Sequence, residues 1–182
     1  MYFINLSTEL EEIASELLAL ADCVSEFKVE QATDCLLSKV NAAWPELIEI
    51  MSRQAHEITR FKNGQIYIKR WVLKQRTKGS TDPVVFLHKM CAPDTGYPHD
   101  HSWDHVSLIL RGGHSDDHLT AKHFLPAGSL VSRPAALIHR LSPAKEGDET
   151  ISLVATSHKF RDWAFVVRDK KINGNNIIPT GK

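Results

Sequence analysis

Histidine is the residue type whose spacing in this chain points most directly to chemistry. Eight of the ten histidines lie between positions 88 and 139, and His99, His101 and His105 stand just before the apolar run 106–110. In a β-strand these three share one parity, so their imidazoles leave the same face. The Cα atoms of His99 and His101 would lie roughly 6.6 Å apart, a span that two imidazoles can close onto one ion. The spacing therefore predicts a metal site.

A further metal ligand must come from another part of the chain. His139 is the best candidate, because it lies in a second strand-like stretch, 133–141, beyond a turn at 125–128. For His105 two interpretations stay open: it is a fourth ligand, or it fills the interior beside a three-histidine site. Neutral imidazoles leave the charge of a divalent ion uncompensated, which favours an anionic substrate or a reduced oxygen species. A purely structural histidine cluster is the alternative to a bound metal.

The same stretch resembles the first motif of the cupin superfamily, in which a His-x-His pair precedes a Glu and then a Gly. His99 and His101 match the pair, His105 stands where Glu is usual, and Gly112 follows after six further residues. The turn Pro126-Ala-Gly128 resembles the Pro-x-Gly turn of the second motif, whose later histidine would be His139. The resemblance covers roughly residues 84 to 142.

The cupin resemblance implies a mainly β fold, an antiparallel barrel or jelly roll, here preceded by an N-terminal α-helical segment. Its implied function is that of a metal-dependent enzyme, and the leading hypothesis is a non-haem Fe(II) dioxygenase acting on a small anionic metabolite. Zn, Ni or Mn remain open as the metal, since an imidazole set alone does not identify the ion. The alternatives are a zinc-dependent isomerase, epimerase or hydrolase, and a non-catalytic module that binds a small molecule.

Four further residues are candidates for substrate binding. Arg133 and Arg140, near the second motif, would clamp a substrate carboxylate in bidentate fashion, with surface ion pairs as the alternative. Trp103 shares the parity of the three histidines and would form an apolar wall beside the metal, or simply part of the barrel core. His88 lies in the run 84–90, which is apolar on both faces and predicts a central strand bordering the barrel interior.

Composition and charge exclude several classes of protein. No apolar run reaches the roughly 18 residues of a membrane span, and no signal peptide is visible, so we expect no membrane association and a cytoplasmic location. Residues 1–57 hold 11 acidic and 3 basic side chains, and residues 58–182 hold 11 acidic and 19 basic ones, which gives −8 and +8. The basic residues stand singly, which argues against nucleic acid. The expected partner is therefore a small anionic molecule.

Residues 1–57 are predicted to form a helical segment. Ser7-Thr8 followed by Glu11 predicts a capping box at the start of the first helix, whose apolar residues recur at steps of three and four. A second helix is expected over 29–40, and a third begins at Pro45, a good first-turn residue, and ends near position 56. This segment is expected to pack on the barrel, with formation of a homodimer as the alternative role.

Residues 58–170 are predicted to form the barrel, because short strands alternate there with Gly- and Pro-containing turns. Asn63-Gly64 is a strong hairpin signal. The strands are expected at 65–76, 84–90, 130–133, 137–141, 150–156 and 163–168. The tail, 171–182, is rich in Asn and Gly and is expected to be loosely ordered.

A second hairpin is expected around the polar pair Asp116-Asp117. Three histidines flank this pair, and a hairpin tip would place them on the surface. His114, His118 and His123 are therefore expected to face solvent rather than to bind the metal.

Overall fold

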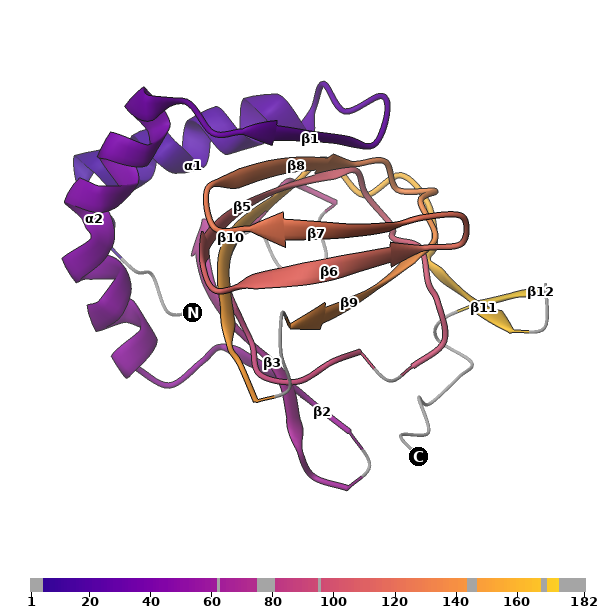
Figure 1. The fold of residues 1–182 in the computed structure, drawn as a ribbon. Helices are drawn as coiled ribbons and strands as arrows, with labels where there is room; N and C mark the ends of the chain where they lie inside the picture. The colour runs from indigo at the N-terminus through magenta and orange to yellow at the C-terminus, as the bar shows by residue number, and fades with distance from the viewer. Residues whose placement is uncertain are drawn as a thin grey trace.

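The computed structural model describes residues 5–61, 63–74, 81–94, 96–143, 147–167 and 170–173, and its core is a barrel of two antiparallel sheets (Figure 1). The larger sheet contains, in spatial order, β1 (Lys28–Gln31), β8 (Ser129–Arg133), β5 (His105–Arg111), β10 (Thr150–Thr156), β4 (Val85–Met90), β3 (Ile66–Lys74) and β2 (Glu57–Arg60). The smaller sheet contains β7 (Lys122–Pro126), β6 (Gly113–His118) and β9 (His139–Pro143), and β11 (Ala164–Val167) pairs with β12 (Lys170–Asn173). The antiparallel barrel predicted from the sequence is confirmed.

The two faces of the larger sheet have different neighbours. Leu87, Leu108 and Leu153 are buried on the outer face, in one core cluster with both helices. Residues of the opposite parity, such as His88 and Ser152, line an internal cavity. This alternation follows from the period of two in a β-strand, and it means that a single sheet supports both the helical layer and the candidate site.

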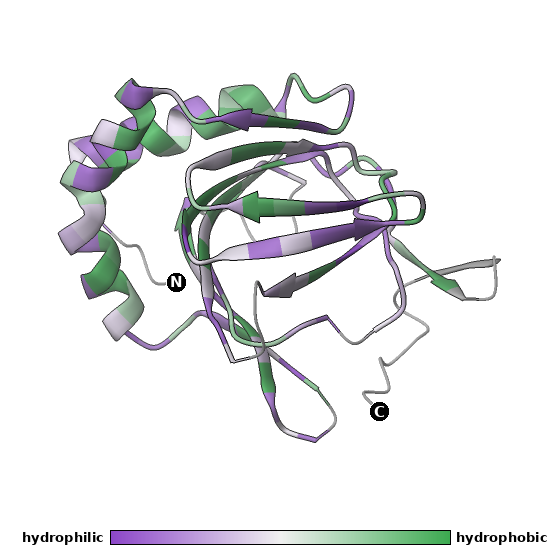
Figure 2. Cartoon of the chain, in the orientation of Figure 1, coloured by the Kyte–Doolittle hydropathy of each residue, from purple (hydrophilic) through white to green (hydrophobic). Residues whose placement is uncertain are grey.

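The first helix, α1 (Thr8–Ala21), forms as predicted. The Ser7 hydroxyl accepts a hydrogen bond from the Leu10 N–H and so satisfies one of the donors left open at a helix N-terminus. The buried face of α1 includes Ile13 and Leu17, and it packs against β5 and β10. Figure 2 shows hydrophobic green segments on the helices and on the strands that they cover.

The second part of the N-terminal segment differs from the prediction. Residues 28–31 form β1, which pairs with β8, and the two helices expected over 29–40 and from Pro45 are one continuous helix, α2 (Asp34–Ser52). Pro45 lies inside α2 and supplies no N–H to the helix. The helix continues through it because buried residues on both sides, Val40 and Leu47 among them, keep one face on the common core, and such packing outweighs local propensity.

Both predicted hairpins form. β2 and β3 pair around Asn63-Gly64, with Gly64 at a φ of 85°, a conformation that favours glycine. The hairpin expected around Asp116-Asp117 is β6 and β7, but its turn follows His118, and both aspartates lie inside β6. Asp116 was taken for a turn residue on its polarity, but its side chain is fully buried.

The end of the chain is described only in part. Residues 170–173 form β12, and the rest of the tail expected to be loosely ordered, from 174 onward, lies outside the described residues. Within the described ranges, no helix combines the length and the apolar character needed to cross a membrane.

Candidate metal centre

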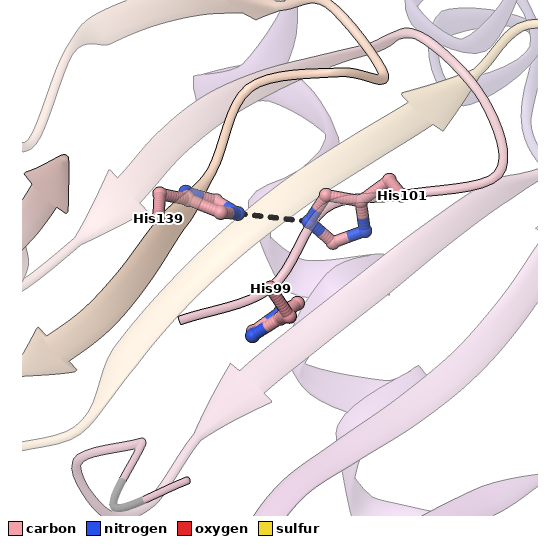
Figure 3. Close-up of side chains that lie close together, drawn as sticks. All are labelled: His99, His101 and His139. Carbon is pink, nitrogen blue, oxygen red and sulfur yellow. Dashed lines mark hydrogen bonds between the residues drawn. The ribbon is translucent and has the colours of Figure 1, made fainter. Parts of the chain in front are cut away.

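The structure brings His99, His101 and His139 together. One candidate ligand nitrogen from each lies within 4.8 Å of the others, and Figure 3 shows the three rings converging from two segments of the chain. The Nε2 atoms of His101 and His139 are 2.8 Å apart. Two nitrogens bound at right angles to one ion, each at about 2.1 Å, would be separated by about 3.0 Å. The spacing therefore fits two neighbouring positions on a metal ion.

Backbone pairing fixes this arrangement. His139 is the first residue of β9, and its backbone exchanges two hydrogen bonds with that of His99: the His99 N–H donates over 3.1 Å and the His139 N–H over 3.0 Å. The His101 N–H donates to the carbonyl of Ala135, 2.9 Å away. His101 and His139, which are 38 residues apart in sequence, thus lie next to each other.

The continuous strand expected from His99 to His105 is not formed. His99 makes an isolated bridge, and the strand β5 begins at His105. Two buried or half-buried carboxylates bind the intervening loop: Asp100 accepts hydrogen bonds from the Ala164 N–H and the Arg161 guanidinium, and Asp104 accepts one from the Ala135 N–H. These long-range hydrogen bonds hold the loop in place of regular β-sheet pairing. The expectation that His105 leaves the same face as His99 and His101 assumed a continuous strand, so it does not apply.

His105 lies beside the three-histidine group but outside it. It is buried, and its ring centroid lies 4.7 Å from that of His101 and 6.3 Å from that of His139. Its Nδ1 has no hydrogen-bond partner among the described residues, and the side chain lines the internal cavity. This placement matches the interpretation of His105 as a wall residue next to the site.

Asp116 orients His139. The His139 Nδ1–H donates to Asp116 Oδ1 over 2.7 Å, because a carboxylate can only accept, so the lone pair of His139 lies on Nε2. This Nε2 is the atom that would bind a metal, and it is hydrogen-bonded to Nε2 of His101 (Figure 3). Asp116 Oδ2 accepts a hydrogen bond from Arg133 Nε at 2.6 Å, and both side chains are buried. A histidine held by a carboxylate at Nδ1 is the arrangement that metal-binding histidines commonly show.

The two arginines predicted to bind substrate are placed differently. Arg133 lines the cavity but is 1% exposed, and it also donates to Ser107 Oγ at 3.0 Å and lies 3.3 Å from His114 Nε2. Its guanidinium is thus engaged with the protein. Arg140 lies on β9 between His139 and Leu141, which both line the cavity, so its own side chain leaves the opposite face.

Burial controls the protonation of the site. Burial, followed by the charges of neighbouring histidines and of Arg133, holds the pKa of His101 well below its ordinary value. The pKa of His139 is lowered by burial, against the opposing effect of Asp116. For Asp116 itself burial favours a higher pKa, but Arg133 and His139 outweigh it and the pKa falls far below the usual range. At neutral pH the imidazoles of His101 and His139 are therefore uncharged, the form that binds metals.

The site opens into a cavity of about 620 Å³. His88 and Trp103, both predicted to bind substrate, line this cavity together with the three histidines. A second cavity of about 360 Å³ shares His99, His101 and Trp103 with the first. A small molecule in either cavity would therefore have access to the histidine group.

Several contributors to the site were not found from sequence. Asp116 was assigned to a turn, and Arg70, which lines both cavities, was not singled out. His114 and His118 were expected to face solvent, but both side chains are largely buried. The missed signal was the shared parity of His114, Asp116 and His118, which as a strand would place three polar groups on one face.

The sequence matches no family model and no curated protein. Similar solved structures include KdgF from Halomonas sp. (16% identity, TM-score 0.43, covering 58% of this chain and 90% of that protein) and an RmlC-like cupin protein from Ralstonia eutropha JMP134 (18%, 0.46, 64% and 71%). The Fe(II) form of HppE is similar at 16% identity and a TM-score of 0.44, over 55% of each chain. Several further similar structures are named as cupin or cupin-like proteins.

Proposed function

We propose that this chain is a metal-dependent enzyme in which His99, His101 and His139 hold one divalent ion. The observation that carries the proposal is the convergence of three imidazoles within 4.8 Å, one of them oriented by a buried carboxylate, at the wall of a 620 Å³ cavity. Each feature fits a metal: nitrogen donors, close spacing and, at His139, a fixed tautomer.

The finer proposal is a non-haem Fe(II) dioxygenase, which transfers both atoms of O₂ to its substrate. When bound, Fe(II) would activate O₂ and supply the coordination positions, while the substrate itself would supply the electrons. Three protein ligands leave three positions of an octahedron open, which suits the binding of substrate and O₂ side by side. The chain's own contribution is to fix the three imidazoles and to line the cavity in which the substrate would lie.

Arg70 supports an anionic substrate. It lines both cavities, and its side chain is half-buried, with Nη1 3.2 Å from Thr59 Oγ1 and 3.6 Å from Glu57 Oε2. Arg133, which lines the larger cavity, is neutralised by its ion pair with Asp116. An incoming carboxylate would therefore compete with Glu57 for Arg70, at the border between the two cavities.

The second candidate function uses the same three-histidine metal site without O₂ chemistry. A zinc ion on the same three histidines would leave one tetrahedral position for water or substrate, as in catalytic zinc sites. Imidazole is a good ligand for zinc as well as for iron, so the same three histidines suit either ion.

Metal analysis tests the proposal directly. We expect about one ion per chain in protein purified without added metal, and loss of most of it in His139→Ala. The matched control is His158→Ala, because His158 is exposed and lies outside the group. With iron loaded anaerobically, addition of O₂ and small thiol, amino-acid or keto-acid anions should then consume oxygen. Equal metal content in His139→Ala and His158→Ala would refute the site, and indifference to oxygen across the set would favour zinc chemistry.

A further inference from the structure

A charged pair lies behind the candidate metal centre, inside the barrel. Asp116 on β6 and Arg133 at the end of β8 are joined by the 2.6 Å bond between Oδ2 and Nε, and they are 0% and 1% exposed. The other oxygen of Asp116 holds His139 at 2.7 Å, and Ser107 from β5 accepts a hydrogen bond from Arg133. Four strands therefore meet at one buried network that ends on a candidate ligand.

Stability alone does not explain this pair. Removing two charges from water costs several kcal/mol per ion, and apolar replacements of buried ion pairs are often neutral or stabilising. A neutral acceptor such as a backbone carbonyl would also be enough to orient His139. The chain instead places the ionised carboxylate of Asp116 against the ionised guanidinium of Arg133. The two charges therefore do more than orient the His139 ring.

That consequence concerns the histidine that would bind the metal. A carboxylate on Nδ1–H makes an imidazole a stronger donor at Nε2. An ionised carboxylate strengthens this donor most when nothing else shares its negative charge. Arg133 binds the other oxygen of Asp116 and withdraws part of that charge. The network thus sets how much of the negative charge of Asp116 acts on the His139 ring.

We propose that Arg133 is a positioning residue that acts through Asp116 to set the donor strength of His139 toward the metal, and that it does not bind substrate. The inference rests on the proposed function, because it needs a metal on His139. It also gives a role to Ser107 and His114, which contact the guanidinium at Nη1 and Nη2 while Asp116 contacts it at Nε.

The test uses the full chain loaded with Co(II) or Fe(II). Asp116→Asn removes the charge but keeps an oxygen that can accept from Nδ1–H, and we expect it to weaken Co(II) binding by about 10–100-fold and to raise the Fe(III)/Fe(II) potential. Arg133→Lys keeps the positive charge and should bind Co(II) within about threefold of wild type. The matched control is Asp117→Asn, since Asp117 is the next residue on β6, faces the other way and pairs with Lys122.

A double variant keeps the test informative if Asp116→Asn fails to fold. Asp116→Asn combined with Arg133→Gln leaves no unpaired charge, and it should fold, lose affinity for Co(II) and show the same upward shift of potential. Wild-type affinity and potential in this double variant, or in Asp116→Asn, would overturn the inference while leaving the metal site intact. A wild-type protein that binds no metal would instead overturn the proposed function.

Discussion

His88 is a half-buried residue whose effect on stability can be measured by replacing it. Its Nε2 is shielded from solvent and has no hydrogen-bond partner within the described part of the chain. Leucine fills a similar volume without a polar atom, and a buried unsatisfied polar group costs about 1–3 kcal/mol. We expect His88→Leu to raise the free energy of unfolding at pH 7 by about 1 kcal/mol, the low end of that range, because the cavity is wide enough to hold water.

The difference should grow as the pH falls. Burial, and then the positive charge of Arg70, hold the pKa of His88 well below its ordinary value of 6.5. The unfolded chain binds a proton near pH 6.5 that the folded chain does not, so acidification below this pH favours unfolding of the wild type by up to about 1.4 kcal/mol per pH unit. His88→Leu has no such proton and escapes this part of the loss.

Urea unfolding of the metal-free proteins at pH 7, 6 and 5 provides the measurement. His158→Leu is the control, because an exposed histidine should change the free energy of unfolding by less than about 0.5 kcal/mol. A His88→Leu variant that is less stable than wild type at pH 7, or whose advantage does not widen toward pH 5, would refute the reasoning. A more stable but inactive variant would show that His88 is retained for its ligand at a cost to stability.

Three further predictions test other parts of the structure. His105→Phe should leave the metal affinity within about threefold of wild type, since its effect on binding would be indirect, and loss of the metal would make His105 a ligand. Burial, and then Arg133, lower the pKa of His114 to about 3, so the metal-free protein should lose stability between pH 6.5 and 3, and His114→Gln should reduce that slope by up to about 1.4 kcal/mol per pH unit. Leu17→Ala, at the buried face of α1, should cost about 2–5 kcal/mol in urea unfolding, whereas the exposed Leu20→Ala should cost under about 0.5 kcal/mol.

Elements with local signals were predictable from the sequence. The first helix is marked by the cap at Ser7, and the β2–β3 hairpin by Asn63-Gly64, which needs a positive φ at glycine. The prediction that a separate helix begins at Pro45 was wrong for a physical reason. A proline inside a helix costs about 3 kcal/mol, which is less than the stabilisation from burying one face of α2 in the core. That burial depends on strands far away in sequence, so the residues around Pro45 do not indicate it.

The three histidines of the candidate site were predictable from the sequence, but the charged residues that support them were not. His99 and His101 stand close together in sequence, and His139 was found through its position in a second apolar stretch, so the group that converges was named in advance. The network behind it was not, because Asp116 and Arg133 are 17 residues apart and belong to different sheets. The residue type alone does not distinguish a buried aspartate such as Asp116 from an aspartate in a turn.

The loop from His99 to His105 shows why the site depends on distant parts of the chain. A regular strand would hold its histidines through a ladder, but here Asp100 is bound to residues 61 and 64 positions away, and Asp104 to one 31 positions away. Asp100, which is buried, and Asp104, which is half-buried, hold the loop through these hydrogen bonds. The directions of the His99 and His101 rings therefore depend on contacts with residues 135, 161 and 164 and not on the local spacing alone, although a strand could also have brought two imidazoles to one ion.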